Sequence, residues 1–179
     1  STAGKLLFDT EDKPEEKSEP KKEYRIADHD IRSTAHEYQT TQSEEDIRKL
    51  LAELKKHKTI SFDTETTGID PTQSELVGMS FALKAHEAWY VPVPANQTEA
   101  QKLVDGFKDL LENEDKQFIG QNIKFDMLQL LQYGVDMPAP AFDTMIAHYL
   151  IEPDQRHKLD YLSESYLNYK MVPIEDLIG

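Results

Sequence analysis

This chain is organised around the stretch Phe62-Asp63-Thr64-Glu65-Thr66-Thr67-Gly68, which directly follows Lys58-Thr59-Ile60-Ser61. Polar and apolar residues alternate through the first part of this region, so the pattern predicts a β-strand that ends at the carboxylates. Asp63 and Glu65 are separated by one residue, which places both side chains on the same face of the strand. Two such carboxylates can share hard divalent cations. The stretch therefore indicates metal-assisted chemistry on phosphate esters.

The same four residue types occur a second time, at Phe8-Asp9-Thr10-Glu11, but in different surroundings. This copy leads into residues 12–22, which offer no apolar side chain for a core. A segment of that composition stays solvated, because burial cannot offset the entropy lost on ordering. We expect residues 1–34 to form a charged flexible linker. Residues 35–179 are then one domain, long enough to bury a sizeable core.

Composition excludes several classes of protein. The 179 residues include 20 Lys and Arg and 34 Asp and Glu, a formal charge of −14, which argues against a broad basic surface for nucleic acid. A nuclease can still be acidic, because its metal ions invert the local charge. The chain has no cysteine, so a disulfide framework and a thiolate metal site are excluded. No apolar run approaches the roughly 20 residues of a membrane span, so we expect an intracellular protein without a membrane partner.

Hydrophobic periodicity and end signals divide the domain into helices and strands. The predicted strands are His36–Thr41, the strand of Asp63 and Glu65, Leu76–Leu83, Ala88–Val93 and Gln117–Gly120. The predicted helices are 44–57, 98–111, Ile123–Tyr133, Phe142–Ile151, Leu159–Tyr169 and a short one after Pro173. This order predicts an α/β protein with a ribonuclease H-like three-layer fold, in which helices flank a mixed five-stranded sheet.

Several blocks of the sequence resemble one family, in that family's order. Phe62-Asp63-Thr64-Glu65-Thr66 resembles the first exonuclease motif of the DEDD superfamily. Gly120-Gln121-Asn122-Ile123-Lys124-Phe125-Asp126 resembles the second motif in the form found in bacterial family A DNA polymerases. Further similar blocks are Leu76–Ala82, Phe142–Met145 and Leu159–Glu164, so the resemblance covers about residues 36–179. An isolated Asp-x-Glu is usually two surface carboxylates, but the ordered blocks reverse that interpretation.

The resemblance implies a catalytic site for two divalent metal ions, Mg²⁺ or Mn²⁺. Asp63 would bridge the two ions, Glu65 would bind the tighter one, and Asp126 would hold the second through waters. Two such ions can activate a water and stabilise the leaving 3′ oxygen of an in-line displacement. Three carboxylates brought together repel one another, and metal binding relieves that repulsion.

The resemblance also implies weaker contacts to nucleic acid. Thr66 and Ile69 match positions that contact the terminal nucleotide, and Asn122 matches an asparagine near the scissile phosphate. Lys124 is interpreted equally well as a phosphate contact and as a solvated residue at a helix start. Asp143 is interpreted first as a helix N-cap and second as a residue that supports a metal ligand.

The third motif of the family, Tyr-x-x-x-Asp or His-x-x-x-x-Asp, has no counterpart after Asp126. We expect the domain to be truncated at Gly179, before the helix that carries this motif. The tighter metal site would then lack a ligand. Hydrolysis by this chain alone should be low or absent.

The resemblance implies a 3′-5′ proofreading exonuclease domain that removes mispaired 3′-terminal nucleotides from DNA in the bacterial cytoplasm, at the nucleoid. Its expected partners are a single-stranded 3′ end of DNA, an adjoining polymerase domain that synthesises DNA in replication and repair, and a 5′ nuclease domain of the same parent chain. Two alternatives stay open, a ribonuclease D-like RNA 3′ exonuclease and a catalytically inactive exonuclease-fold scaffold.

Overall fold

The computed structural model describes residues 27–138, 141–173 and 176. The main sheet has six strands, in the order β2 (Glu37–Thr40), β5 (Glu87–Pro92), β4 (Leu76–Lys84), β3 (Thr59–Thr66), β6 (Gln117–Gly120) and β7 (Phe142–Asp143). The helices are α1 (Glu44–Lys56), α2 (Gln97–Leu111), α3 (Ile123–Leu131), α4 (Thr144–Ile151) and α5 (Leu159–Leu167). A separate two-stranded sheet pairs β1 (His29–Asp30) in parallel with β8 (Tyr169–Lys170).

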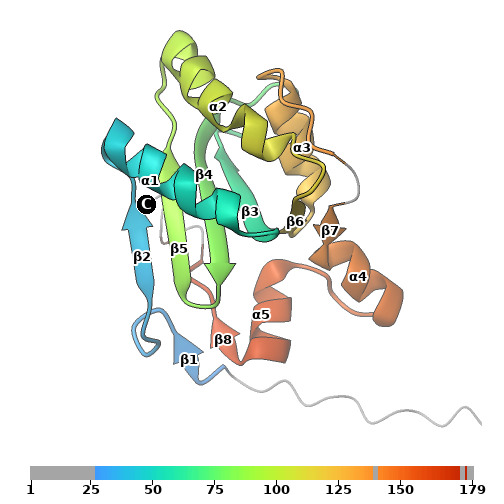
Figure 1. Ribbon diagram of the computed structural model, residues 1–179. Coiled ribbons are helices and arrows are strands. Elements are labelled where there is room, and N and C mark those ends of the chain that lie inside the picture. The colour runs from blue at the N-terminus through green and yellow to red at the C-terminus, as the bar shows by residue number, and fades with distance from the viewer. Residues whose placement is uncertain (1–26, 139–140, 174–175, 177–179) are drawn as a thin grey trace, which may run out of the picture.

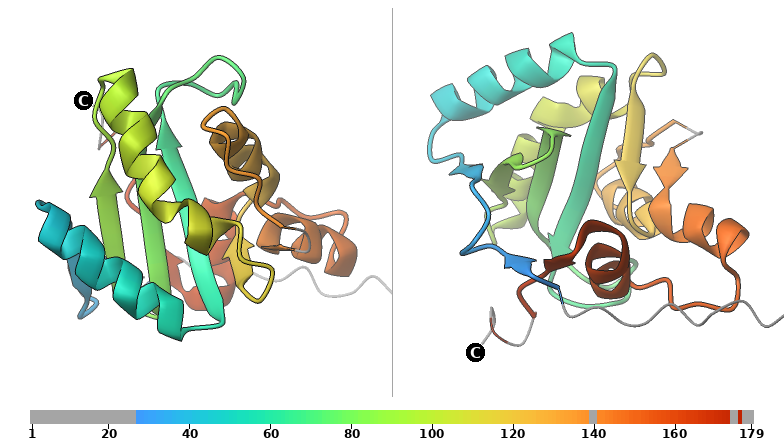
Figure 2. Two further views of the ribbon diagram at one scale, coloured as in Figure 1. Left: turned by 45° about the horizontal axis from the view of Figure 1, so that its top comes forward. Right: turned by 90° about the horizontal axis from the view of Figure 1, so that it is seen from below.

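Helices lie on both sides of the main sheet. α1 and α2 run across one face (Figure 1), and α5 lies with the small sheet on the opposite side (Figure 2). The central strand β3 is antiparallel to β4 and parallel to β6, and β6 is parallel to β7. The α/β, ribonuclease H-like architecture predicted from the sequence is confirmed. Its three parallel strands β3, β6 and β7 end at one edge of the sheet.

The two helices on the first face begin at side-chain caps. The Ser43 hydroxyl accepts a hydrogen bond from the Asp46 backbone N–H at the start of α1. The Asn96 side chain accepts from Thr98 and Glu99 at the start of α2. The predicted start of this helix at residue 98 is therefore late. Asn96 lies two residues earlier and satisfies two free backbone donors at once, as a good N-cap does.

Aromatic side chains fix β3 at the centre of the core. Phe62 of β3 lies 5.2 Å from Phe81 of β4 between ring centroids, and Phe81 stacks on Phe107 of α2 at 5.4 Å. All three rings are almost completely buried. Burying each such side chain contributes about 1.5–3 kcal/mol. The strand that carries Asp63 and Glu65 is thus held rigidly from the face opposite the two carboxylates.

The main sheet has one strand more than the five predicted. Phe142 and Asp143, predicted as the start of a helix, form β7 instead, and the helix begins at Thr144. The backbone of Asp143 is extended, and its side chain accepts hydrogen bonds from Met145 and Ile146. An N-cap residue has this non-helical conformation, so the predicted helix start was two residues early.

The small sheet falls partly inside the predicted linker. Its first strand, β1, lies at His29–Asp30, and residues 1–26 lie outside the described residues. Nearby, α4 and α5 meet at a buried histidine: His148 Nδ1 lies 2.7 Å from His157 Nδ1, and His148 Nε2 lies 3.1 Å from the Tyr166 hydroxyl. Within the described ranges, every helix is too short or too polar to cross a membrane.

Candidate active site

The alternation of β3 separates its side chains into two environments. Ile60, Phe62 and Thr64 point into the protein and are at most 8% exposed. Asp63 and Glu65 point to the opposite face, where both are exposed to solvent. The strand thus presents its two carboxylates side by side on an open surface.

Asp126, in the first turn of α3, is held against β3 by two hydrogen bonds. β6 pairs with β3 only over Thr59–Ser61, so the edge of β3 beyond that point is open to α3. There the Thr64 backbone N–H donates to Asp126 Oδ1 over 2.8 Å, and the Thr64 hydroxyl donates to the same oxygen over 2.6 Å. Asp126 is only 2% exposed. The residue between the two strand carboxylates therefore fixes the third carboxylate next to them.

Gly120 allows α3 to start this close to β3. A Cβ at Gly120 would lie 2.9 Å from the Cβ of Ile123 and 3.0 Å from the carbonyl oxygen of Phe62. Real Cβ atoms essentially never show a contact as short as that with Ile123, and the contact with the Phe62 carbonyl is tighter than nine in ten real ones. The Phe62 carbonyl cannot move without shifting β3. The absence of a side chain at Gly120 is thus a condition for placing Asp126.

Substituting Gly120 by alanine is expected to destabilise the fold by about 1–3 kcal/mol, the usual cost of overpacking a tight interior. Gly106, on α2, is the matched control, because a Cβ there would meet nothing within 4 Å. Gly106→Ala should stabilise the protein by about 0.5–1 kcal/mol through helix propensity. Urea unfolding of both variants measures the difference. Equal stabilisation by both alanines would show that the turn before α3 relaxes freely.

The carboxylates raise one another's pKa values. The Asp63 side chain is accessible to water, yet the protein atoms packed around its carboxyl group and then the charges of Asp126 and Glu65 raise its pKa to about 7. Burial raises the pKa of Asp126 to about 6, and the negative charge of Asp143 adds to this increase. The two hydrogen bonds from Thr64 act in the opposite direction and lower the pKa of Asp126. For both groups burial is the largest cause, because a poorly solvated site disfavours the charged form of a carboxyl group.

The donor set suits hard divalent cations. Carboxylate oxygens are the ligands that Mg²⁺ and Mn²⁺ prefer, and repulsion between carboxylates is what a bound cation relieves. Among residues 27–138, 141–173 and 176, no three Asp, Glu, His or Cys side chains are grouped as a ready-made metal site. Asp63, Glu65 and Asp126 are the residues whose oxygen atoms fit the ions by their chemistry.

Comparison with known proteins identifies the family. Residues 38–176 match the family described as 3′-5′ exonuclease. The chain belongs to this 3′-5′ exonuclease family. The DNA polymerase I of Borreliella burgdorferi is 38% identical over 144 residues, which cover 79% of this chain and 16% of the relative. The DNA polymerase I of Pseudomonas aeruginosa is 35% identical over 138 residues, covering 72% of this chain and 15% of the relative. The chain thus spans a small part of these relatives.

Solved structures show the same fold. Brucella melitensis NrnC with bound Mg²⁺ superposes with a TM-score of 0.61 at 22% identity, covering 78% of this chain and 65% of the other. Escherichia coli RNase D, an exoribonuclease, superposes with a TM-score of 0.56 at 14% identity, covering 72% of this chain and 33% of the other. At these identities the likeness concerns the fold alone. Exonucleases of the DEDD superfamily use divalent metal ions.

The residues expected to contact the terminal nucleotide or the phosphates lie on two turns of this exonuclease-family chain. Thr66 ends β3, and its hydroxyl donates to the Gly68 carbonyl over 2.7 Å. Ile69 is 97% exposed on the loop that follows. Asn122 has a left-handed backbone with φ of 57° directly before α3, and Lys124 is exposed in the first turn of α3. Both turns adjoin the carboxylates in sequence.

Hydrogen bonds order the loop that carries Ile69. Asp70 Oδ1 accepts from the backbone N–H and the hydroxyl of Thr72 over 2.9 and 2.7 Å. From α3, the Gln129 side-chain amide donates to the Ser74 carbonyl over 3.0 Å. The exposed apolar side chain is therefore presented by an ordered loop that is tied to the helix of Asp126.

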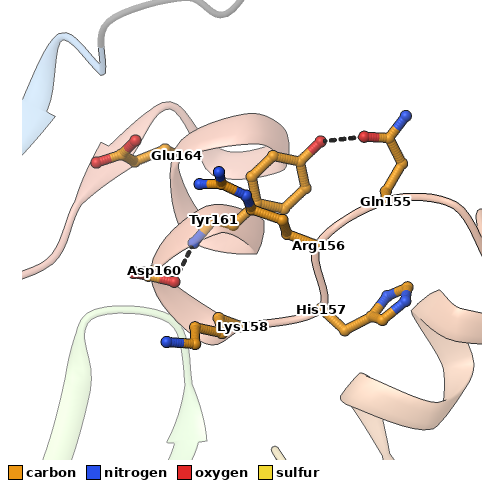
Figure 3. A pocket seen from close by; sticks show the side chains of 7 residues that line it. All are labelled: Gln155, Arg156, His157, Lys158, Asp160, Tyr161 and Glu164. Carbon is orange, nitrogen blue, oxygen red and sulfur yellow. Dashed lines mark hydrogen bonds between the residues drawn. The ribbon is translucent and has the colours of Figure 1, made fainter.

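A pocket of mixed charge at the start of α5 was not predicted from the sequence. It has a volume of about 420 Å³ and is lined by Gln155, Arg156, His157, Lys158, Asp160, Tyr161 and Glu164 (Figure 3). Gln121, in the turn before α3, donates to the His157 carbonyl over 2.6 Å. The only signal in the sequence was the consecutive run Arg156-His157-Lys158. Nothing in that run predicts contact with Gln121.

Proposed function

We propose that this chain is the 3′-5′ exonuclease domain of a DNA polymerase I and removes mispaired 3′-terminal nucleotides by two-metal-ion hydrolysis of the phosphodiester bond. The observation that carries the proposal is the pair of hydrogen bonds from Thr64 to Asp126, which brings the carboxylate of the second motif to the strand of the first. The family match and the DNA polymerase I relatives support the same function.

The three carboxylates have distinct roles in the proposed site. Asp63 and Glu65 would hold the ions from β3, Asp63 as the ligand common to both and Glu65 as a ligand of the tighter one. Thr64 occupies Oδ1 of Asp126 and so fixes the orientation of that carboxylate toward the second ion. When bound, the two ions activate the attacking water and stabilise the leaving 3′ oxygen. The protein contributes a rigid strand and a capped helix start that hold these ligands.

The substrate is a single-stranded 3′ end of DNA. Ile69 and Thr66 contact the terminal nucleotide, while Asn122 and Lys124 face the phosphates. With a formal charge of −14 the chain has little capacity to grip duplex DNA. An adjoining polymerase domain supplies that grip, and the segment before β1 connects the exonuclease domain to a 5′ nuclease domain. The parent protein acts at the nucleoid in the bacterial cytoplasm.

Degradation of labelled oligonucleotides tests the proposal. A 5′-labelled single strand of DNA, incubated for long times with excess protein and Mn²⁺ or Mg²⁺, should give a ladder that shortens slowly from the 3′ end. The RNA of the same sequence should be cut more slowly. Faster cleavage of RNA would support the ribonuclease D-like alternative, to which the RNase D fold points. No cleavage of either, together with no Mn²⁺ binding, would support an inactive scaffold.

Ile69→Ala should slow removal of the terminal nucleotide by about tenfold, equal to the loss of about 1.4 kcal/mol of apolar contact. Thermal stability should not change, because the Ile69 side chain is 97% exposed and buries nothing within the chain. Leu167→Ala, at an exposed position of α5, is the matched control and should leave cleavage unchanged. Single-turnover rates measure both variants. A wild-type rate for Ile69→Ala would remove Ile69 from the substrate site.

A further inference from the structure

Asp143 joins two helix starts through one of its carboxylate oxygens. It is the last residue of β7 and pairs with Gly120 at the end of β6. Its Oδ1 accepts from the backbone N–H groups of Met145 and Ile146 over 2.8 and 3.3 Å, which caps α4. The same oxygen accepts from the Asn122 N–H over 3.0 Å, directly before α3. Asp143 therefore fixes the turn that leads to Asp126.

The other oxygen of Asp143 has no partner. Among the buried side-chain nitrogen and oxygen atoms of the described residues, Asp143 Oδ2 is the one without a hydrogen bond. Helix capping does not explain this second oxygen, because serine, threonine or asparagine caps a helix with a single acceptor. A buried acceptor without a donor is costly, so such an atom in a native protein indicates a missing donor such as a water or an ion.

The unpartnered oxygen belongs to the group of carboxylates at the end of the parallel strands. Asp143 ends β7, which lies beside β6 and two strands from β3 in the sheet, and its Oδ1 accepts from the N–H of Asn122, four residues before Asp126. The negative charge of Asp143 raises the pKa of Asp126, which agrees with this placement. Thr64 already occupies Oδ1 of Asp126. A hydrated cation beside Asp126 would bring donors to this region in the form of its water ligands. Metal ligands are commonly oriented by such outer hydrogen-bond partners.

We propose that Asp143 is a positioning residue of the second metal site: its Oδ1 fixes the start of α3, and its Oδ2 accepts a hydrogen bond from the hydration shell of the ion beside Asp126. This inference rests on the proposed exonuclease function. It adds a fourth carboxylate that acts through water and touches neither ion.

Asp143→Asn is the decisive variant. Asparagine keeps an acceptor for the three backbone donors, but it replaces Oδ2 by an amide that donates. Mn²⁺ binding to the whole chain, measured from the electron paramagnetic resonance signal of free Mn²⁺, should show a weaker second ion by about 10- to 100-fold, as for other outer partners of metal ligands. Helix content and melting temperature without metal should equal those of the wild type.

Two controls make the result specific. Asp109→Asn removes the same charge from an exposed position of α2 and should leave Mn²⁺ binding unchanged. Asp143→Ala removes the cap as well and should lower the melting temperature. Wild-type Mn²⁺ affinity in Asp143→Asn would overturn the inference, as would a melting temperature reduced as far as in Asp143→Ala. Absence of Mn²⁺ binding to the wild type would instead overturn the proposed function itself.

Discussion

Asp63→Ala is expected to reduce hydrolysis of a single-stranded 3′ end by at least about a thousandfold, because a ligand shared by both ions accounts for several kcal/mol of transition-state stabilisation. The fold should remain intact. The Asp63 side chain points away from the aromatic core into solvent, so its removal leaves no cavity. Single-turnover cleavage at excess protein, with Mn²⁺ and long incubation, measures a slow residual rate.

The chain contains its own matched control for this variant. Asp9 occupies the same tetrapeptide, Phe8-Asp9-Thr10-Glu11, without the surrounding strand pattern. Asp9→Ala removes an identical charge and should cut at the wild-type rate. Near wild-type cleavage by Asp63→Ala would refute the assignment of the catalytic site. Equal losses in both variants would show that overall charge, and not a metal ligand, controls the rate.

Local periodicity was sufficient to predict the strand that presents the first two carboxylates. Alternation from Lys58 to Phe62 predicts the strand and shows which of its two faces is buried. The one-residue spacing of Asp63 and Glu65 then places both carboxylates on the same face. The strongly periodic helices α1 and α2 were predicted for the same reason. These features depend on near neighbours in sequence, which a pattern can reveal.

Contacts between distant residues were not open to this kind of prediction. Asp126 is 62 residues from Thr64, and no local signal joins them. Only the resemblance of the second motif indicated that Asp126 approaches the strand. The pairing of β1 with β8 and the contact of Gln121 with the His157 carbonyl had no such motif and were not predicted.

Strands of only two residues are also difficult to predict from a sequence pattern. Phe142 and Asp143 form β7, but two residues cannot show alternation, so the apolar run after them dominated the prediction and extended the helix. The same short segment holds the one buried side-chain acceptor without a partner in the described part of the chain. A departure from the local pattern thus coincides with a functional candidate, as is common where a site imposes its own geometry.

Stability without metal should fall as the pH rises from about 4 to about 7. The pKa values of Asp63 and Asp126 in the folded protein are about 7 and about 6, above the ordinary 3.8. Between these values the folded state keeps protons that the unfolded state has released. Ionising the folded site therefore costs free energy as the pH increases. The contribution is complete below about pH 4 and is lost as the pH passes the folded-state pKa values.

Asp126→Asn isolates this effect from the other titrating groups of an acidic chain. Asparagine can still accept the two hydrogen bonds from Thr64, but it carries no charge. Because the substitution removes the charge of Asp126, it also lowers the pKa of Asp63, which that charge raises in the wild type. The gain in unfolding free energy over the wild type should grow with pH and approach about 3 kcal/mol at neutral pH, at 1.36 kcal/mol for each pH unit between 3.8 and about 6.

Urea unfolding measures this difference in unfolding free energy between the variant and the wild type. It is done with a chelator present, at several pH values from 4, near the ordinary carboxyl pKa, to 8. Asp109→Asn, on the exposed surface of α2, should show no such dependence. Millimolar Mn²⁺ should stabilise the wild type most at high pH, because the ions bind only the ionised carboxylates of the folded state. A difference that stays constant with pH would mean that burial and the charge of Asp143 do not raise the pKa of Asp126 in the folded protein, and the argument that a bound cation relieves this cost would be lost.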